Sequence, residues 1–130
     1  MTTANDIIRQ SLLEIGVLAV GESASADEAN DSLTLLNDLL AEWELNGIAI
    51  GAQSMALDTV VPWPQNHNRP IMLNLALRLA PQFGVTVNPV TAQGATRGYR
   101  ALQAAYGTPN EMLLDRALRR VRYPSGRWFL

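Results

Sequence analysis

The chain has 130 residues, of which 48% are hydrophobic and 17% are charged, so it is large and apolar enough for one domain with a hydrophobic core. It contains no cysteine, which excludes disulfide scaffolds, cysteine-ligated metal and cysteine nucleophiles. Its one histidine, His67, excludes a multi-histidine metal site. No apolar run approaches the ~18 residues that a membrane helix needs, and the N-terminus lacks the pattern of a signal peptide. We therefore expect no cofactor, no metal, no membrane partner, and a chain that is cytosolic when made.

The charges are divided unevenly along the chain. Residues 1–60 carry ten acids and one arginine, a net of −9, and residues 61–130 carry two acids and nine arginines, a net of +7, which together give −2. Such asymmetry is typical of a chain with a charged partner or of head-to-tail self-association. Every basic residue is arginine. Composition drift in a GC-rich genome explains this as well as interface use, where the guanidinium group pairs in a bidentate manner and tolerates partial burial.

Two N-terminal helices are predicted by their capping signals. Each begins with a hydroxyl residue that an acid follows three positions later. These pairs are Thr3 with Asp6 and Ser25 with Glu28. The first helix is expected to stop at Gly16, and the second, about 20 residues long, at Gly47. Residues 17–24 form a short connector between them.

The helical spacing of the hydrophobic residues ends after Gly47. Residues 48–51 and 54–61 contain β-branched residues without a helical stripe, so we expect a short strand pair or an extended loop there. Pro62 and Pro64 end this segment, because proline cannot continue a β-ladder.

A third helix begins near Pro70, which the first turn of a helix tolerates, and we expect Pro81 and Gly84 to close it. It is apolar nearly all round, which is typical of a helix packed on several sides, by the core or by neighbouring subunits. Three- and four-residue spacing on the second and third helices predicts a buried core. Its members are Leu33, Leu36, Leu40, Trp43, Leu75 and Leu79.

A fourth helix is capped by Asn88 and Pro89 and ends at Gly107. Small residues dominate it and allow another backbone to approach closely, which suits tight lateral packing. They are Ala92, Gly94, Ala95, Gly98, Ala101, Ala104 and Ala105. A fifth helix is predicted over residues 110–121, with its acids early and its arginines late, as the helix dipole favours. Residues 127–130 place three large apolar side chains at the terminus, where such groups are normally docked against something.

These elements predict a mainly α fold. It is a small helix bundle of four to five helices, with a short β-hairpin or extended loop around residues 48–62 and an extended C-terminal arm. We divide the chain into a helical domain, residues 1–107, and a C-terminal helix with a docking arm, residues 108–130.

Two constellations could carry chemistry. His67 would need a nucleophile and an orienting acid to act as a general base, and its neighbours Ser54 and Asp58 belong to no known motif. We interpret it as a turn histidine that caps the third helix. Asp38 and Glu42 share a helix face, as the two carboxylates of a glycosidase would share a cleft, but we interpret them as part of a solvated acidic face.

Three further features of the sequence bear on ligand binding. Glu44, which also flanks Trp43, points away from the face that Asp38 and Glu42 share. Residues 94–98 lie in the middle of a helix with no strand before them, so they do not form a phosphate loop. The arginine cluster of residues 116–127 suits nucleic acid or an acidic protein surface, and the hydrophobic end of the chain favours protein.

Three segments of the chain resemble one protein family. They read IRQSLLEIGV over residues 8–17, AEWELNGIAIG over residues 41–51 and NLALRLAPQFG over residues 74–84. Together they are similar to the head-completion adaptor of short-tailed bacteriophages, also called the tail accessory factor or packaged-DNA stabilisation protein, and to the wider head-to-tail connector group. The resemblance covers about residues 5–107.

The resemblance implies a helical structural virion protein, not an enzyme, at the head–tail interface. It implies a twelve-membered ring of the protein itself beneath the dodecameric portal protein. Such a ring extends the DNA tunnel, retains the packaged genome and provides the attachment platform for a downstream tail or nozzle protein. Packaged double-stranded DNA would pass through it without sequence-specific binding. Some family members are linked to cell-wall hydrolysis, but the match carries over no catalytic residue.

The family's C-terminal arm reaches up to the portal. Here the segment after Gly107 matches that arm by position and character, not by residue identity, and it is shorter than in the best-known members. The expected portal and subunit-interface residues are Arg116, Arg119, Arg120, Arg122, Tyr123, Arg127, Trp128, Phe129 and Leu130. From the divided charge we also predict that acids of residues 1–60 face arginines of residues 61–130 in a neighbouring subunit.

Three other functions fit parts of the sequence. A small DNA-binding protein would use the fifth helix as a basic arm, with polar rather than aromatic flanks. A peptidoglycan hydrolase would need two carboxylates that face one cleft. A free-standing helical scaffold protein would need neither feature.

Overall fold

The computed structural model describes residues 1–51 and 54–107. This part of the chain is mainly α, as predicted, with four α-helices and one 3-10 helix, η1. In chain order they are α1 (Ala4–Glu14), α2 (Ala26–Leu45), η1 (Gln65–His67), α3 (Asn68–Gln82) and α4 (Pro89–Tyr106). The predicted fifth helix and the C-terminal arm lie outside the described residues.

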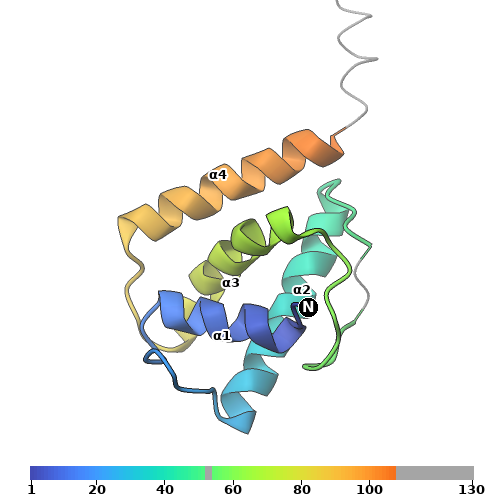
Figure 1. Ribbon diagram of the computed structural model, residues 1–130. Coiled ribbons are helices and arrows are strands. Elements are labelled where there is room, and N and C mark those ends of the chain that lie inside the picture. The colour runs from blue at the N-terminus through green and yellow to red at the C-terminus, as the bar shows by residue number, and fades with distance from the viewer. Residues whose placement is uncertain (52–53, 108–130) are drawn as a thin grey trace, which may run out of the picture.

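Helix α3 is the centre of a small helix bundle. It packs against α1, α2 and α4, and in Figure 1 it lies between α1 and α4. Its buried residues are Ile71, Met72, Leu73, Leu75, Ala76, Leu79 and Ala80. The nearly all-round apolar pattern of the third helix therefore has its explanation within this chain, because three other helices cover it.

The predicted helix signals at the N-terminal ends are confirmed. In both capping boxes the hydroxyl accepts the backbone N–H of the acid, and the acid accepts the backbone N–H of the hydroxyl residue. The pairs are Thr3 with Asp6 and Ser25 with Glu28. The Asn88 side chain accepts the N–H of Val90 at 2.9 Å. Gly16 and Gly47 follow the ends of α1 and α2 with φ of +79° and +92°, in the left-handed region that glycine adopts without steric cost.

The end of the third helix differs from the prediction. Pro81 does not close α3, because it lies inside the last turn and the helix continues to Gln82. A proline here gives up the N–H bond to the Leu77 carbonyl and crowds that carbonyl. The buried residues Leu79 and Ala80 nevertheless hold the preceding turn against the core. Gly84, with φ of +68°, is the residue at which the chain turns away.

The segment after α2 is a loop in its described part. No strand is present in residues 48–51 or 54–62, so the strand pair is not formed there and the extended-loop alternative describes this segment. Val60 instead makes an isolated antiparallel bridge with Thr3. Its two hydrogen bonds run from Val61 N–H to the Thr2 carbonyl and from Ala4 N–H to the Thr59 carbonyl, both at 3.0 Å. The β-forming residues therefore pair with the N-terminus, far away in sequence.

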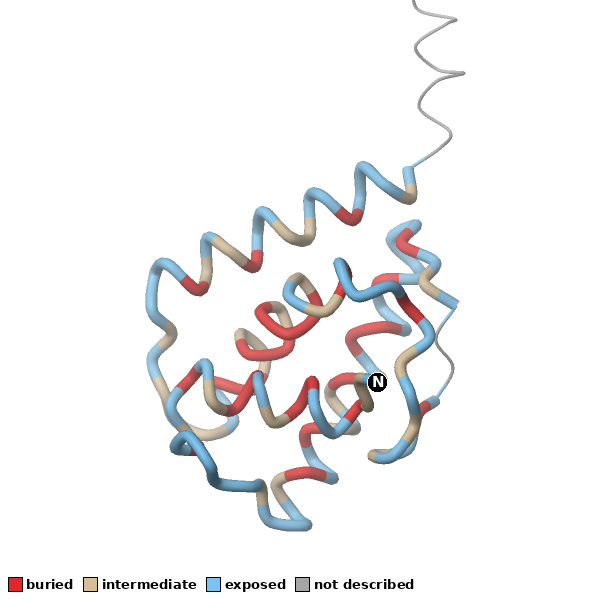
Figure 2. The backbone as a smooth tube through the Cα atoms, viewed as in Figure 1, coloured by how far each residue is buried: buried red, intermediate tan, exposed pale blue. Residues whose placement is uncertain are grey.

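The hydrophobic core lies where the helices face one another (Figure 2). Five of the six predicted core residues are buried, namely Leu36, Leu40, Trp43, Leu75 and Leu79. The sixth, Leu33, is partly buried and packs against the core at the margin of the α2 stripe. Ile48, Met55 and Trp63 of the α2–α3 connection also enter the core. None of the helices in the described ranges has the length and apolar character needed to cross a bilayer.

Candidate functional site

Helix α4 is attached to the rest of the bundle through one face. The positions on that face recur every three or four residues, so they line up along the helix axis. Thr91, Ala95 and Leu102 are buried, and Tyr99 and Tyr106 are partly buried. The opposite face of α4 is exposed, so this helix forms an outer layer of the described structure (Figure 2).

Polar contacts from every other helix of the described part hold α4 in place. They are Thr91 Oγ1 to Glu14 Oε2 at 2.8 Å, Asn74 Nδ2 to the Ala95 carbonyl at 3.0 Å, Asn46 Nδ2 to Tyr99 Oη at 3.1 Å, and His67 Nε2 with Tyr106 Oη at 2.8 Å. They are spread from the first turn of α4 to its last. The axial position of the helix is therefore defined along its whole length.

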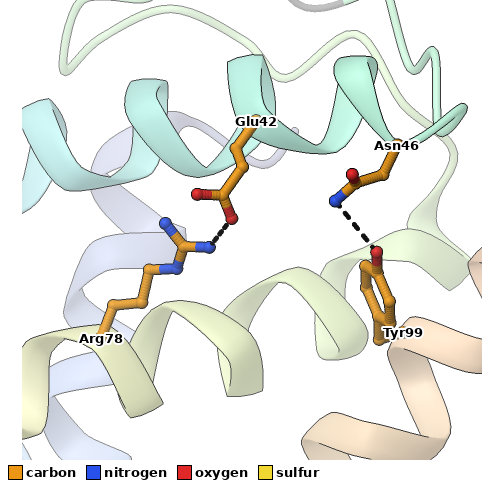
Figure 3. Close-up of polar contacts among 4 residues, drawn as sticks. All are labelled: Glu42, Asn46, Arg78 and Tyr99. Carbon is orange, nitrogen blue, oxygen red and sulfur yellow. Dashed lines mark hydrogen bonds and ion pairs between the residues drawn. The ribbon is translucent and has the colours of Figure 1, made fainter.

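Two of the segments that carry the family resemblance meet in this arrangement. Glu42 of α2 forms an ion pair with Arg78 of α3, and Asn46, the C-cap residue of α2, contacts Tyr99 of α4 (Figure 3). The ring of Tyr99 also packs against Trp43, with 5.3 Å between the ring centroids. Residues of segments 41–51 and 74–84 thus form the surface against which α4 packs.

Two small residues of α4 allow the predicted close approach of another backbone, here within the bundle, and lateral packing between subunits stays a prediction. A methyl group at Gly98 would lie 2.8 Å from Pro70 Cβ, and one at Gly94 would lie 3.0 Å from Leu73 Cδ1. Both glycines therefore allow the close approach of α3 of the same chain. The alanines at 101, 104 and 105 are exposed and are not used by the described part of the chain.

His67 occupies the N-cap position of α3, but its side chain does not cap the helix, contrary to the prediction. Its Nδ1 lies 2.6 Å from Asn66 Oδ1 and its Nε2 lies 2.8 Å from Tyr106 Oη. Burial lowers the pKa of His67, because the protonated ring loses water contacts. The two ring nitrogens are thus engaged by residues other than Ser54 and Asp58, and the histidine acts as a link between η1 and the end of α4.

Asp38 and Glu42 lie on the solvent-exposed side of α2, as interpreted from the sequence. Asp38 and Glu44 are exposed, and Glu42 pairs with Arg78 rather than with a second carboxylate. Within residues 1–51 and 54–107, no group of three or more histidines or acids is arranged to hold a metal ion.

The outer face of α4 carries two arginines that sequence reasoning did not single out. Arg97 and Arg100 are exposed, and with Gln93 and Thr96 they border a shallow hollow of about 310 Å³. Their signal was present in the sequence, since they lie three residues apart on the side opposite Leu102 and Tyr106.

The predicted portal and subunit-interface residues, all between Arg116 and Leu130, lie outside the described residues. The structure places Gly107, the residue that precedes the C-terminal segment 108–130. Gly107 directly follows Tyr106, whose hydroxyl contacts the buried His67.

A scan against family profiles and a search of curated proteins both found no match to this chain.

Proposed function

We propose that the chain is a structural virion protein, a head-to-tail adaptor that forms a ring under the portal. In this role it extends the DNA tunnel, retains the packaged genome and provides the platform for the downstream tail or nozzle protein. The ring has twelve copies, and DNA passes through it without sequence-specific binding. The proposal originates in the resemblance of residues 8–17, 41–51 and 74–84.

One observation carries the proposal furthest. The two longer motif segments contact each other through Glu42 and Arg78, and together they seat α4 through Asn46 and Asn74. Their polar groups therefore act as parts of a scaffold. A scaffold role suits an adaptor, whose task is to present surfaces in a fixed geometry rather than to perform a reaction.

The scaffold also defines where the C-terminal segment begins. The four contacts along α4 fix its axis, and the contact of Tyr106 with His67 fixes its last turn. Residues 108–130 follow at once and contain five arginines and a terminal Trp128-Phe129-Leu130. We propose that this segment is the arm that docks on the portal, with Trp128 and Phe129 as anchors, since aromatic and arginine residues dominate binding hot spots.

The reach of the arm is sufficient for contact with a second ring. Ten residues beyond Arg120, if extended, span up to about 33–36 Å. We propose that this reach carries the arm across one subunit onto the neighbouring ring.

The test is a truncation after Val121, compared with the full chain for binding to purified portal rings. The truncation leaves the whole described core, from Ala4 to Leu102, in place, so we expect the truncated protein to keep the thermal midpoint of the full chain. It should lose portal binding. The double substitution Trp128→Ala and Phe129→Ala serves as a less drastic variant, with the exposed Val20→Ala as a matched apolar control.

Unchanged portal affinity of the folded truncated protein would show that the arm hypothesis is wrong. Loss of a salt-sensitive affinity for duplex DNA, with portal binding retained, would instead favour the DNA-binding alternative.

A further inference from the structure

We infer that the exposed face of α4 is a docking site for an acidic ridge of α2, formed by Asp27, Asp31 and Asp38, on a second copy of this chain. The α4 docking face consists of Gln93, Thr96, Arg97 and Arg100. This inference rests on the proposed function, because it names the surfaces through which copies of the adaptor would contact one another.

Within residues 1–51 and 54–107, no other segment covers the α4 docking face. Its four residues are exposed and surround the shallow hollow of about 310 Å³ described above. The single ion pair found in the described ranges joins Arg78 to Glu42, so Arg97 and Arg100 make none there. Two guanidinium groups three residues apart lie on one side of a helix, where they can pair with carboxylates on a facing helix.

A complementary surface exists on α2. Asp27, Asp31 and Asp38 are exposed and are spaced four and seven residues apart, so they form one acidic ridge along the outside of that helix. The inner side of α2 is occupied by the core residues Leu36 and Leu40. The ridge is about 16 Å long at a rise of 1.5 Å per residue, which accommodates both arginines of the α4 docking face.

The two surfaces cannot meet within one molecule. Trp43 of α2 and Tyr99 of α4 contact each other with ring centroids 5.3 Å apart, so the inner sides of the two helices are turned toward each other at that point. The acidic ridge and the α4 docking face lie on the outer sides of their helices and therefore point away from one another. Only a second copy can bring them together.

The contact is therefore heterologous, with different surfaces on its two sides. Such contacts repeat from copy to copy and close into a ring or continue as a filament. Duplex DNA is a less suitable occupant of the α4 docking face, because that face offers two cations among neutral residues, whereas the rest of the described chain is strongly acidic. Each exposed acid–arginine pair contributes only about 0–1 kcal/mol, so the contact should depend on salt.

The absence of cysteine makes disulfide trapping a direct test. One full-length chain carries Gln93→Cys on the α4 docking face and a second carries Thr34→Cys beside the acidic ridge; both positions are exposed and no charge is altered. On mild oxidation of an equal mixture, the mixed disulfide should clearly exceed half of all dimers, the random share. The excess should disappear toward 1 M salt, where the Debye length falls to about 3 Å.

Charge reversal provides the second arm of the test. Arg97→Glu with Arg100→Glu should remove the excess of mixed disulfide, and so should Asp31→Arg with Asp38→Arg. Combining the two reversed surfaces should restore it, because attraction is re-established with the signs exchanged. The matched controls are Arg69→Glu and Glu44→Arg, which reverse exposed charges outside both surfaces and should leave the mixed disulfide in excess.

A mixed disulfide at the random share, at low salt and with folded chains, would overturn the inference. The inference would also be overturned if the mixed disulfide stayed in excess both with Arg97→Glu and Arg100→Glu and with Asp31→Arg and Asp38→Arg. If Arg97→Glu with Arg100→Glu abolished duplex DNA binding while trapping stayed random, the face would be a nucleic-acid surface. The trapping contains no portal, so its failure is distinguishable from loss of portal binding, which tests the adaptor role itself.

Discussion

Gly98 of α4 lies directly against Pro70 of α3. A methyl group at Gly98 would lie 2.8 Å from Pro70 Cβ and 2.9 Å from Pro70 Cα, which is closer than two carbon atoms can approach without displacement. The pyrrolidine ring cannot rotate away, because proline is tied to its own backbone. Gly98 is therefore the position of α4 at which the approach of α3 tolerates no side chain.

This contact predicts different effects at the two glycines of α4. Gly98→Ala should destabilise the protein by about 1–3 kcal/mol, as overpacking of a rigid contact does. Gly94→Ala meets only Leu73 Cδ1, the end of a flexible side chain, at 3.0 Å. The gain of up to about 1 kcal/mol in helix propensity should then offset that contact. Urea denaturation of both variants measures the difference, and equal losses would contradict the role of Pro70.

The buried stripe of α2 gives a second prediction. Leu36 is fully buried, whereas Leu33, three residues earlier, is only partly buried. Leu36→Ala should cost roughly 2–5 kcal/mol, because it removes buried methyl groups and leaves a cavity. Leu33→Ala is the matched control and should cost clearly less. Denaturation midpoints within error of the wild type for Leu36→Ala would show that the core assignment is wrong.

The contact of His67 with Tyr106 predicts a dependence of stability on pH. The pKa of His67 is lowered in the folded protein by burial, so the unfolded chain binds more protons as the pH falls. The free energy of unfolding should therefore decrease between about pH 7 and pH 5. His67 is the only histidine, so an NMR titration of its ring reports this group alone.

The matched variant for this prediction is His67→Gln, which has no proton to gain in that range. Its free energy of unfolding should vary less than that of the wild type between about pH 7 and pH 5. A wild-type dependence that the variant reproduces in full would assign the effect to other groups.

The amide of Asn74 gives a fourth prediction. Its Nδ2 donates to the Pro70 carbonyl at 2.8 Å and to the Ala95 carbonyl at 3.0 Å, so it links α3 to α4. Asn74→Asp replaces the donor by a carboxylate that faces two carbonyl oxygens. It should destabilise the protein by about 1–3 kcal/mol at neutral pH, and more than Asn74→Ala does. Thermal melts at pH 7 measure the midpoints of both variants. Midpoints equal to that of the wild type would indicate that the amide donor is unimportant.

The local features of this fold could be predicted from the sequence because they depend on neighbouring residues. The capping boxes at Thr3 and Ser25 and the turns at Gly16 and Gly47 each involve a few consecutive positions, whose geometry the residue types themselves favour. The same holds for the stripe around Leu36, because the apolar stripe of an amphipathic helix faces the core.

The tertiary structure decided the pairings between distant positions. The sequence does not indicate that Val60 pairs with Thr3, that Gly98 faces Pro70, or that His67 contacts Tyr106 rather than the end of α3. It also does not indicate that Pro81 stays within a helix whose preceding turn is held in the core. Such partners depend on how whole helices cross, which many residues determine together. Local preference selects the elements, and packing selects which of their faces meet.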